Sequence, residues 1–414
     1  MKQLYDFKIE KIKDLSPEEI NLRKKNLDLF YQIGFPNKND EDWKFSDLNF
    51  ILSKNFNNIA NRDFLPKNDD INIINEFDHN FISLLNGKLV SSSFSHEEKS
   101  KIFIGNFDYK NQVNINKKNS LYFLNNALAT GGFLLEIAEN YKLKKPLVIY
   151  NNFSSSLKET IVNHKNSIIL NKNSELNLIN YINNSSRENF MVNIVESIKM
   201  KKDSSFNNFL INNSKSNCYF YKYIKSDLEK NSIFKNYLIP SGLKFSKLDI
   251  EINLNEEHSQ SSVFSALNLV NNEHQEIKTR INHNAPNCQS YQKVKNVLNN
   301  ESKGVYQGKI FVKDTAQKTD AYQLSRALIL DDAAEFDAKP ELEIYADDVK
   351  CSHGSTSGSI DLDSIHYLKS RGIPKKIAYQ MLVGGFLKEI LEKLPEGEIK
   401  KFLINKLERQ INGY

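Results

Sequence analysis

Short apolar segments recur through the middle of the chain, from about residue 101 to residue 350, between asparagine, serine, lysine and glycine residues. Many of these segments alternate apolar and polar positions, as residues 176–182 do, and this two-residue period is typical of half-buried strands. Almost no segment here combines helical length with a helical period. The pattern therefore predicts a mainly β core over residues 101–358.

The connections between the predicted strands narrow the choice of β architecture. Asn-Gly hairpin turns are missing from the middle of the chain, whereas a β-sandwich needs tight reversals. In a parallel β-helix, each strand pairs with its equivalent one coil later, and polar corners replace the hairpins. No strict hexapeptide or Gly-Gly-x-Gly repeat accompanies the pattern. The lack of both intervening helices and hairpin turns therefore favours a parallel β-helix.

Helical signals occupy the first hundred residues. Ser16 and Glu19 have the spacing of a capping box, Pro17 suits the first helical position, and Gly34 suits the residue after the helix end. Trp43, the only tryptophan, is predicted to anchor a corner between a helix and a loop. Residues 1–100 are therefore predicted to form an N-terminal helical region.

Residues 359–414 return to a helical pattern. Asp363 can cap a helix over residues 364–370, and Pro374 suits the first turn of a second helix. Gly384 and Gly385 interrupt this second helix at a cost of about 1 kcal/mol each relative to alanine, so we expect close packing around them. The apolar stripes of the last two helices comprise Ala378, Leu382, Phe386 and Ile390, and then Ile399, Phe402, Leu403, Leu407 and Ile411. These helices either cap the β-domain or dock a partner.

Composition and charge exclude several classes of protein. The 414 residues are 40% hydrophobic and 26% charged, and 56 Lys and Arg stand against 51 Asp and Glu without a basic block, which argues against nucleic-acid binding. No run of about 18 apolar residues predicts a membrane span, and a lysine at position 2 and an aspartate at position 6 do not fit a signal peptide. Three scattered cysteines do not form a disulfide framework. We expect a cytoplasmic protein.

The usual signatures of enzymes are missing from the chain. It has no phosphate-binding Gly-x-x-x-x-Gly-Lys-Ser/Thr loop, no dinucleotide-binding glycine motif, no His-Glu-x-x-His and no Gly-x-Ser-x-Gly. We therefore expect no ATP hydrolysis by this chain, and no residue is predicted to be catalytic.

One short string could carry chemistry, namely Cys351-Ser352-His353. In a strand, residues two apart share a face, so the thiol and the imidazole would point the same way. This pair suits zinc, copper(I) or iron–sulfur species, but such sites generally want four ligands, so further ligands would have to come from another chain. Two other interpretations stay open: Cys351 acts as a nucleophile whose pKa is lowered by His353, or both residues are structural.

Several further sequence motifs surround this string. They lie at residues 282–288, 303–310, 316–323, 339–354 and 370–374, with weaker ones at 41–45 and 129–132. Together they resemble the SufB/SufD family of iron–sulfur cluster assembly proteins over most of the chain. The string Ala-Asp-Asp-Val-Lys-Cys-Ser-His-Gly at residues 346–354 is similar to the SufD members and differs from the Glu-His-Glu-Ala type of sequence in SufB. Ser325 and Ser355 depart from the usual Asn and Ala of the family.

The resemblance implies a right-handed parallel β-helix between helical N- and C-terminal regions. It also implies a non-catalytic scaffold subunit that pairs with a SufB-type paralogue through the β-helix and binds a SufC-type ATPase through its C-terminal helices. His353 occupies the position of a histidine in the family's proposed assembly site, and Cys351 is a second candidate ligand. The chain alone is expected to hold no stable cofactor, and the complex to hold a transient iron or iron–sulfur cluster. The residues expected to contact the ATPase are Arg371, Gly372, Pro374, Met381, Gly384, Gly385 and Phe386.

Two competing interpretations use the same fold. A β-helix protein that acts on carbohydrate needs a groove lined by carboxylates or bases and is usually exported. A homo-oligomeric scaffold would pair with a second copy of itself and leave Cys351 and His353 without a metal role. Neither interpretation requires nucleic acid or a membrane.

Overall fold

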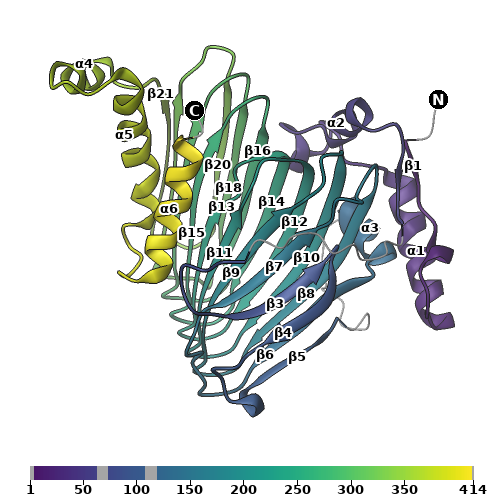
Figure 1. The fold of residues 1–414 in the computed structure, drawn as a ribbon. Coiled ribbons are helices and arrows are strands. Elements are labelled where there is room, and N and C mark those ends of the chain that lie inside the picture. The colour runs from purple at the N-terminus through teal and green to yellow at the C-terminus, as the bar shows by residue number, and fades with distance from the viewer. Residues whose placement is uncertain (1–3, 63–72, 108–118, 413–414) are drawn as a thin grey trace.

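The computed structural model describes residues 4–62, 73–107 and 119–412. Its central feature is a ladder of parallel strands in which each strand pairs with the one two places further along the chain (Figure 1). Each coil therefore contributes one strand to each of two facing sheets, here named sheet A and sheet B. This arrangement confirms the predicted parallel β-helix.

The strands of the two sheets alternate along the chain. Sheet A comprises β6 (Gly131–Ile137), β8 (Ile161–Leu170), β10 (Phe190–Met200), β12 (Ser216–Leu228), β14 (Leu243–Leu254), β16 (His274–His283), β18 (Lys303–Val312) and β20 (Glu335–Ile344). Sheet B comprises β3 (Asn80–Leu85), β7 (Leu147–Phe153), β9 (Glu175–Asn184), β11 (Ser205–Asn212), β13 (Ile233–Ile239), β15 (Gln260–Leu269), β17 (Gln289–Leu298), β19 (Thr319–Ile329) and β21 (Val349–Gly358). Strands β4 (Lys88–Ser93) and β5 (Ile102–Asn106) complete the first coils through antiparallel pairs with β3 and β6.

The alternation in the sequence explains the core. Apolar side chains at every second position of both sheets point inward and form one continuous buried cluster.

Asparagine residues have two structural roles in this fold. Several asparagines, including Asn173 and Asn231, take the left-handed conformation at the corners between strands, which asparagine tolerates better than most residues. Others stack inside the core, where Asn180 Nδ2 donates to Asn208 Oδ1 at 2.8 Å and Asn208 Nδ2 donates to Asn236 Oδ1 at 2.9 Å.

The N-terminal helices cover the outer face of sheet A. They are α1 (Pro17–Ile33), α2 (Leu48–Asn55) and α3 (Ser120–Leu128), with the short 3-10 helices η1 (Ile9–Lys11) and η2 (Glu41–Trp43), and they pack on the tyrosines of β12. A two-residue strand pair joins β1 (Tyr5–Asp6) to β2 (Ile59–Ala60). The predicted capping box is confirmed, because Ser16 Oγ accepts from Glu19 N at 3.2 Å and Glu19 accepts from Ser16 N at 3.0 Å.

Parts of the sequence-based assignment need correction. Residues 80–93, predicted to lie in a helical region, form β3 and β4 and belong to the large sheet. They form a hairpin because Asn86 and Gly87 both adopt positive φ, as the type I′ turn requires. The helix α3 and the 3-10 helix η3 (Lys99–Lys101) also lie near the start of the predicted β core.

The C-terminal helices cover the outer face of sheet B. These are α4 (Leu362–Ser370), α5 (Lys375–Lys388), the 3-10 helix η4 (Glu389–Leu391) and α6 (Glu398–Asn412). The apolar stripes of α5 and α6 bury against β7 to β17, whereas α4 projects away from the sheet (Figure 1). Asp361, and not Asp363, caps α4, since its carboxylate accepts from the backbone N–H groups of Asp363 and Ser364. None of the helices in the described part of the chain is long and apolar enough to cross a membrane.

Candidate functional site

The last coil leaves one end of the β-helix open. Strand β20 pairs with β18, and β21 pairs with β19, but no other strand among the described residues pairs with their outer edges. Both edges therefore present backbone N–H and C=O groups to whatever approaches this end. The string Cys351-Ser352-His353 lies on β21, directly at this open end.

The register places both candidate ligands on one face of β21. Cys351 is the Cα partner of Ala321, and His353 is the Cα partner of Gln323; both of these partners on β19 are buried. Cys351 is half-buried and packs against a small apolar cluster that includes Ala321, whereas His353 is exposed. The thiol therefore lies at the rim of the core and the imidazole is open to a partner.

The thiol of Cys351 is not activated in the isolated chain. Burial raises its pKa, the neighbouring carboxylate of Asp320 raises it further, and a backbone hydrogen bond from Ala321 opposes them only in part. This is opposite to the lowered pKa that a nucleophilic cysteine beside His353 would require. A metal that binds Cys351 has to displace the proton of the thiol, so its binding would be pH-dependent.

A complete metal site is not assembled within the described residues. No group of three or more His, Cys, Asp or Glu side chains in this part of the chain is arranged to hold a metal ion. A thiol and an imidazole are suitable ligands for iron or zinc, but two ligands are too few. The donor set fits a soft metal only when a second surface adds ligands.

A buried polar network that was not predicted from the sequence lies beneath His353. Tyr306 OH donates to Gln323 Oε1 at 3.2 Å, and Gln323 Nε2 donates to the carbonyl oxygen of Glu341 at 3.0 Å. Tyr306 also lies 3.1 Å from Gln292 Oε1. A Cβ atom at Gly308 would collide with Tyr306 and Gln323, so only glycine leaves room for this network. Gly308, within the motif at residues 303–310, was the signal in the sequence that could have indicated this network.

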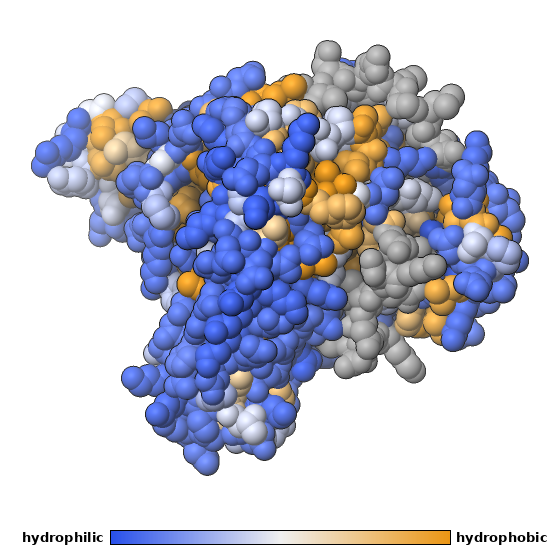
Figure 2. Space-filling view, turned by 90° about the horizontal axis from the view of Figure 1, so that it is seen from below, coloured by the Kyte–Doolittle hydropathy of each residue, from blue (hydrophilic) through white to orange (hydrophobic). Residues whose placement is uncertain are grey.

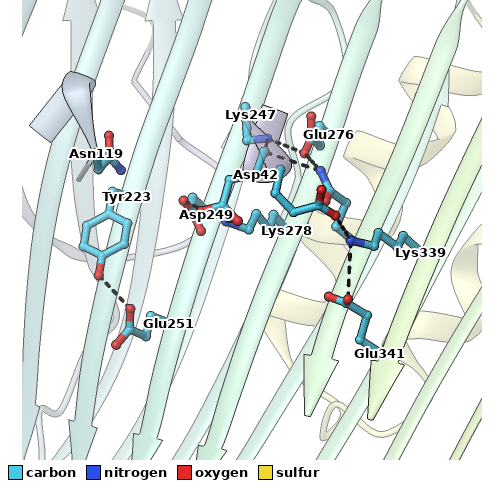
Figure 3. Close-up of polar contacts among 12 residues, drawn as sticks. Asp42, Asn119, Tyr223, Lys247, Asp249, Glu251, Glu276, Lys278, Lys339 and Glu341 are labelled. Carbon is cyan, nitrogen blue, oxygen red and sulfur yellow. Dashed lines mark hydrogen bonds and ion pairs between the residues drawn. The ribbon is translucent and has the colours of Figure 1, made fainter. Parts of the chain in front are cut away.

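A second polar cluster ties the N-terminal region to the outer face of sheet A. Asp42, from η2, lies 2.8 Å from Lys278 Nζ on β16, and its carbonyl oxygen accepts from Lys247 Nζ at 2.5 Å (Figure 3). Lys247 also pairs with Glu276 and lies 4.2 Å from the centre of the Trp43 ring. Trp43 is buried at this corner, as the sequence predicted. On β20, Lys339 pairs with Glu341 at 3.3 Å and with Glu41, so the cluster reaches the open end.

The residues predicted to contact an ATPase fall into two groups. Arg371, Gly372, Pro374, Met381 and Gly385 are exposed. In contrast, Gly384 is buried and Phe386 faces sheet B, where Lys295 Nζ lies 4.2 Å from the centre of its ring.

The predicted close packing around the glycine pair does not occur within this chain. A Cβ atom at Gly385 would meet nothing within 4 Å, and one at Gly384 would meet only Ile411 and Lys388, at ordinary van der Waals distances. The glycines are therefore not required by the packing of α5 on its own chain.

An exposed apolar surface accompanies Gly385. Ile377 and Met381 are 44% and 51% exposed and precede Gly385 by eight and four residues, so the three lie on one stripe of α5. On α4, Leu362 and Tyr367 are exposed as well. Apolar side chains gather on this projecting part, at the left of Figure 2. Of these residues only Met381 was predicted from the sequence, and Leu362, Tyr367 and Ile377 were not.

Comparison with known proteins identifies the family of this chain. The family model described as "SUF system FeS cluster assembly, SufBD core domain" matches residues 152–386, and the model described as "SufBD protein N-terminal region" matches residues 1–149. The chain belongs to the SufB/SufD family. The resemblance predicted from the sequence motifs is thereby confirmed.

Individual members of the SufB/SufD family are similar over different lengths. The iron–sulfur cluster assembly protein SufD of Escherichia coli is 39% identical over 160 residues, which are 39% of this chain and 38% of that protein. SufD of Bacillus subtilis is 34% identical over 133 residues, 32% of this chain and 30% of that protein. A SufBD family protein of Synechocystis is 24% identical over 403 residues, which cover 91% of this chain and 87% of the relative.

Proposed function

We propose that this chain is a non-catalytic scaffold subunit of a SufB–SufC–SufD iron–sulfur cluster assembly complex. The observation that carries the proposal is the position of Cys351 and His353 on β21, whose outer edge pairs with no other strand among the described residues. Two ligands at the end of an open β-helix are useless for a closed metal site but suit a site completed by a second surface. The two relatives named SufD support the cluster-assembly role.

The partner at the open end is a SufB-type paralogue. A second β-helix that ends in the same way can bring its own edge strands against β20 and β21 and satisfy their backbone groups. Its side chains would then complete the ligand set around His353. The iron or cluster is cargo in this scheme: it is assembled at the interface, held transiently and passed on.

The exposed stripe of α5 is the docking surface for a SufC-type ATPase. Ile377 and Met381 offer apolar anchors, and Gly385 lets a partner approach the backbone of α5 closely. ATP binding and hydrolysis in the partner would pull on α4 and α5, and through them on sheet B, whose last strand carries His353. The strain would open the shared interface to iron and sulfur.

The test is native mass spectrometry of the full chain co-expressed with its SufB-type and SufC-type partners. A heteromeric complex that contains the ATPase is expected. A chain that stays alone or pairs only with itself would contradict the proposal and favour a homo-oligomeric scaffold. A sugar-cleavage assay that detects turnover would instead revive the carbohydrate interpretation.

A further inference from the structure

A pocket separate from the open end lies between α6 and sheet B. It has a volume of about 210 Å³, and its lining includes Asn213, Lys215, Gly242, Glu273, Lys406 and Arg409. These residues come from the C-terminal half of α6 and from the corners that follow β11, β13 and β15. Strands β17 and β19 separate β15 from β21, so the pocket is not part of the Cys351–His353 site.

The ammonium group of Lys406 is the unusual feature of this pocket. Its side chain is 8% exposed, and its Nζ hydrogen-bonds to Tyr181 OH at 2.6 Å and to Asn213 Oδ1 at 2.8 Å. Both partners are neutral. Within the part of the chain that the structure describes, no carboxylate oxygen lies within 4.0 Å of Lys406 Nζ. Burial lowers the pKa of Lys406 and the charge of Arg409 lowers it further, while the more distant carboxylate of Glu76 opposes them only in part.

Four buried lysines of the β-helix provide a contrast. The pairs are Lys222 with Glu196 at 2.8 Å, Lys247 with Glu276, Lys278 with Asp42 at 2.8 Å, and Lys295 with Glu389. Each of these ammonium groups faces a carboxylate of this chain. Lys406 instead lines a pocket, and among the residues that the structure describes no carboxylate contacts its ammonium group.

The remaining charges make the pocket more positive. Lys215 and Arg409 lie exposed at its rim, and Arg409 reaches Glu76 only at 3.9 Å. The one carboxyl group in the lining, Glu273, is buried, and burial raises its pKa to about 7 despite hydrogen bonds from the backbone of Val270 and Gly242. Glu273 is therefore partly protonated near neutral pH and does not cancel the positive charge.

We propose that this pocket binds a small oxyanion, with its charge paired to Lys406 and screened at the rim by Arg409 and Lys215. The volume is that of about seven water molecules in the liquid, enough for a tetrahedral oxyanion or a small dicarboxylate but not for a nucleotide. The ligand supplies a directly contacting counter-ion, which no described residue supplies to Lys406. The inference does not depend on the scaffold role, since neither edge strand takes part.

Binding of sulfate to the full chain tests the proposal. Calorimetric titration at pH 6.5 and constant ionic strength, with chloride as the balancing anion, is expected to show saturable binding. Thermal unfolding under the same conditions is expected to show a raised melting temperature. Lys406→Met keeps the packing of the side chain but removes the charge, and should weaken binding at least tenfold. Lys401→Met, on the exposed face of α6, is the matched control and should bind as the wild type does.

Two outcomes would overturn the proposal. Sulfate that does not saturate, or that acts equally on wild type and Lys406→Met, would show general salt effects only. Should Lys406→Met fail to fold, the rim variant Lys215→Ala/Arg409→Ala takes its place, and unchanged binding in it would equally contradict the site. Parallel titrations with phosphate and succinate distinguish a tetrahedral oxyanion from a carboxylate as the preferred ligand.

The pH dependence provides a further check on the same pocket. Sulfate stays a dianion between pH 6 and 8, so its own charge does not change, while Glu273 ionises in this range. The charges of Lys215 and Lys244 act on Glu273, and Lys406 and Arg409 line the same pocket. Affinity should fall as the pH rises through about 7, and Glu273→Gln should flatten this dependence. A wild-type affinity that rises with pH would contradict the assigned geometry.

Discussion

His353 on β21 and Gln323 on β19 are Cα partners across the last parallel ladder of the β-helix. The amide of Gln323 is buried and held at both ends, by Tyr306 OH at its oxygen and by the carbonyl of Glu341 at its nitrogen. The exposed imidazole therefore lies beside a fixed polar group and not beside the mobile end of a surface side chain.

Replacing His353 by alanine should abolish the assembly function without affecting the fold. The imidazole is exposed on an edge strand, so the free energy of unfolding should change by less than about 0.5 kcal/mol. The measurement is cluster formation in the reconstituted complex, monitored by visible absorption. The control is His366→Ala, an exposed histidine on α4. Unchanged cluster formation in His353→Ala would remove this residue from the site.

Gly308→Ala should disrupt the buried network beneath His353. The added methyl group collides with Tyr306 and Gln323, and such overpacking of a core typically costs about 1–3 kcal/mol of the free energy of unfolding. Urea denaturation measures the effect. Gly358→Ala on β21 is the matched control, since a Cβ there meets nothing within 4 Å and should be neutral. Equal stability of the two variants would show that the network tolerates the methyl group.

Variants on the exposed stripe of α5 separate docking from folding. Gly385→Ala should raise the free energy of unfolding by up to about 1 kcal/mol, because alanine is the better helix former and the methyl group meets no neighbour. The same variant, and more strongly Met381→Asp, should weaken binding of the SufC-type ATPase. Affinity is measured by titration with the ATPase, and Lys376→Ala on α5 serves as the control. Normal affinity of Met381→Asp would place the docking surface elsewhere.

The ion pairs of Glu389 predict a specific acid sensitivity. Burial alone would raise the pKa of Glu389, but hydrogen bonds from Lys293 and Lys295 outweigh it and lower the pKa to about 2. A carboxylate whose pKa is lower in the folded state stabilises the fold above its unfolded pKa of about 4.3, and this contribution is lost as the pH falls from there towards 2.

Glu389→Gln isolates this contribution. At pH 7 the variant should lose about 1.5–3 kcal/mol of the free energy of unfolding, because two charge-assisted hydrogen bonds are weakened. The difference from wild type should shrink between pH 4.5 and pH 3, as measured by urea denaturation at each pH. Glu392→Gln, near the same helix end, should show no such convergence. A difference that stays constant with pH would contradict the assigned ion pairs.

The sequence by itself determined the local features of this protein. The period of two in the strands, the capping box at Ser16 and the amphipathic stripe of α6 depend on neighbours within a few residues, and these were predicted correctly. The hairpin of β3 and β4 was also indicated locally, by the Asn86-Gly87 turn, although residues 1–100 were predicted to be helical. The Cys351–His353 string was recognised for the same reason, since both residues lie on one strand.

Only the tertiary structure decided which distant residues meet. The parallel ladder places Gln323 beside His353, brings Tyr306 to Gln323 beneath it, and leaves Lys406 facing a pocket instead of a carboxylate. These relationships join residues from different coils, and they depend on the register between strands, which a change of one residue would reverse from core to surface. No pattern within a single segment contains that register. The buried polar network beneath His353 and the charged pocket therefore form only when the coils are stacked.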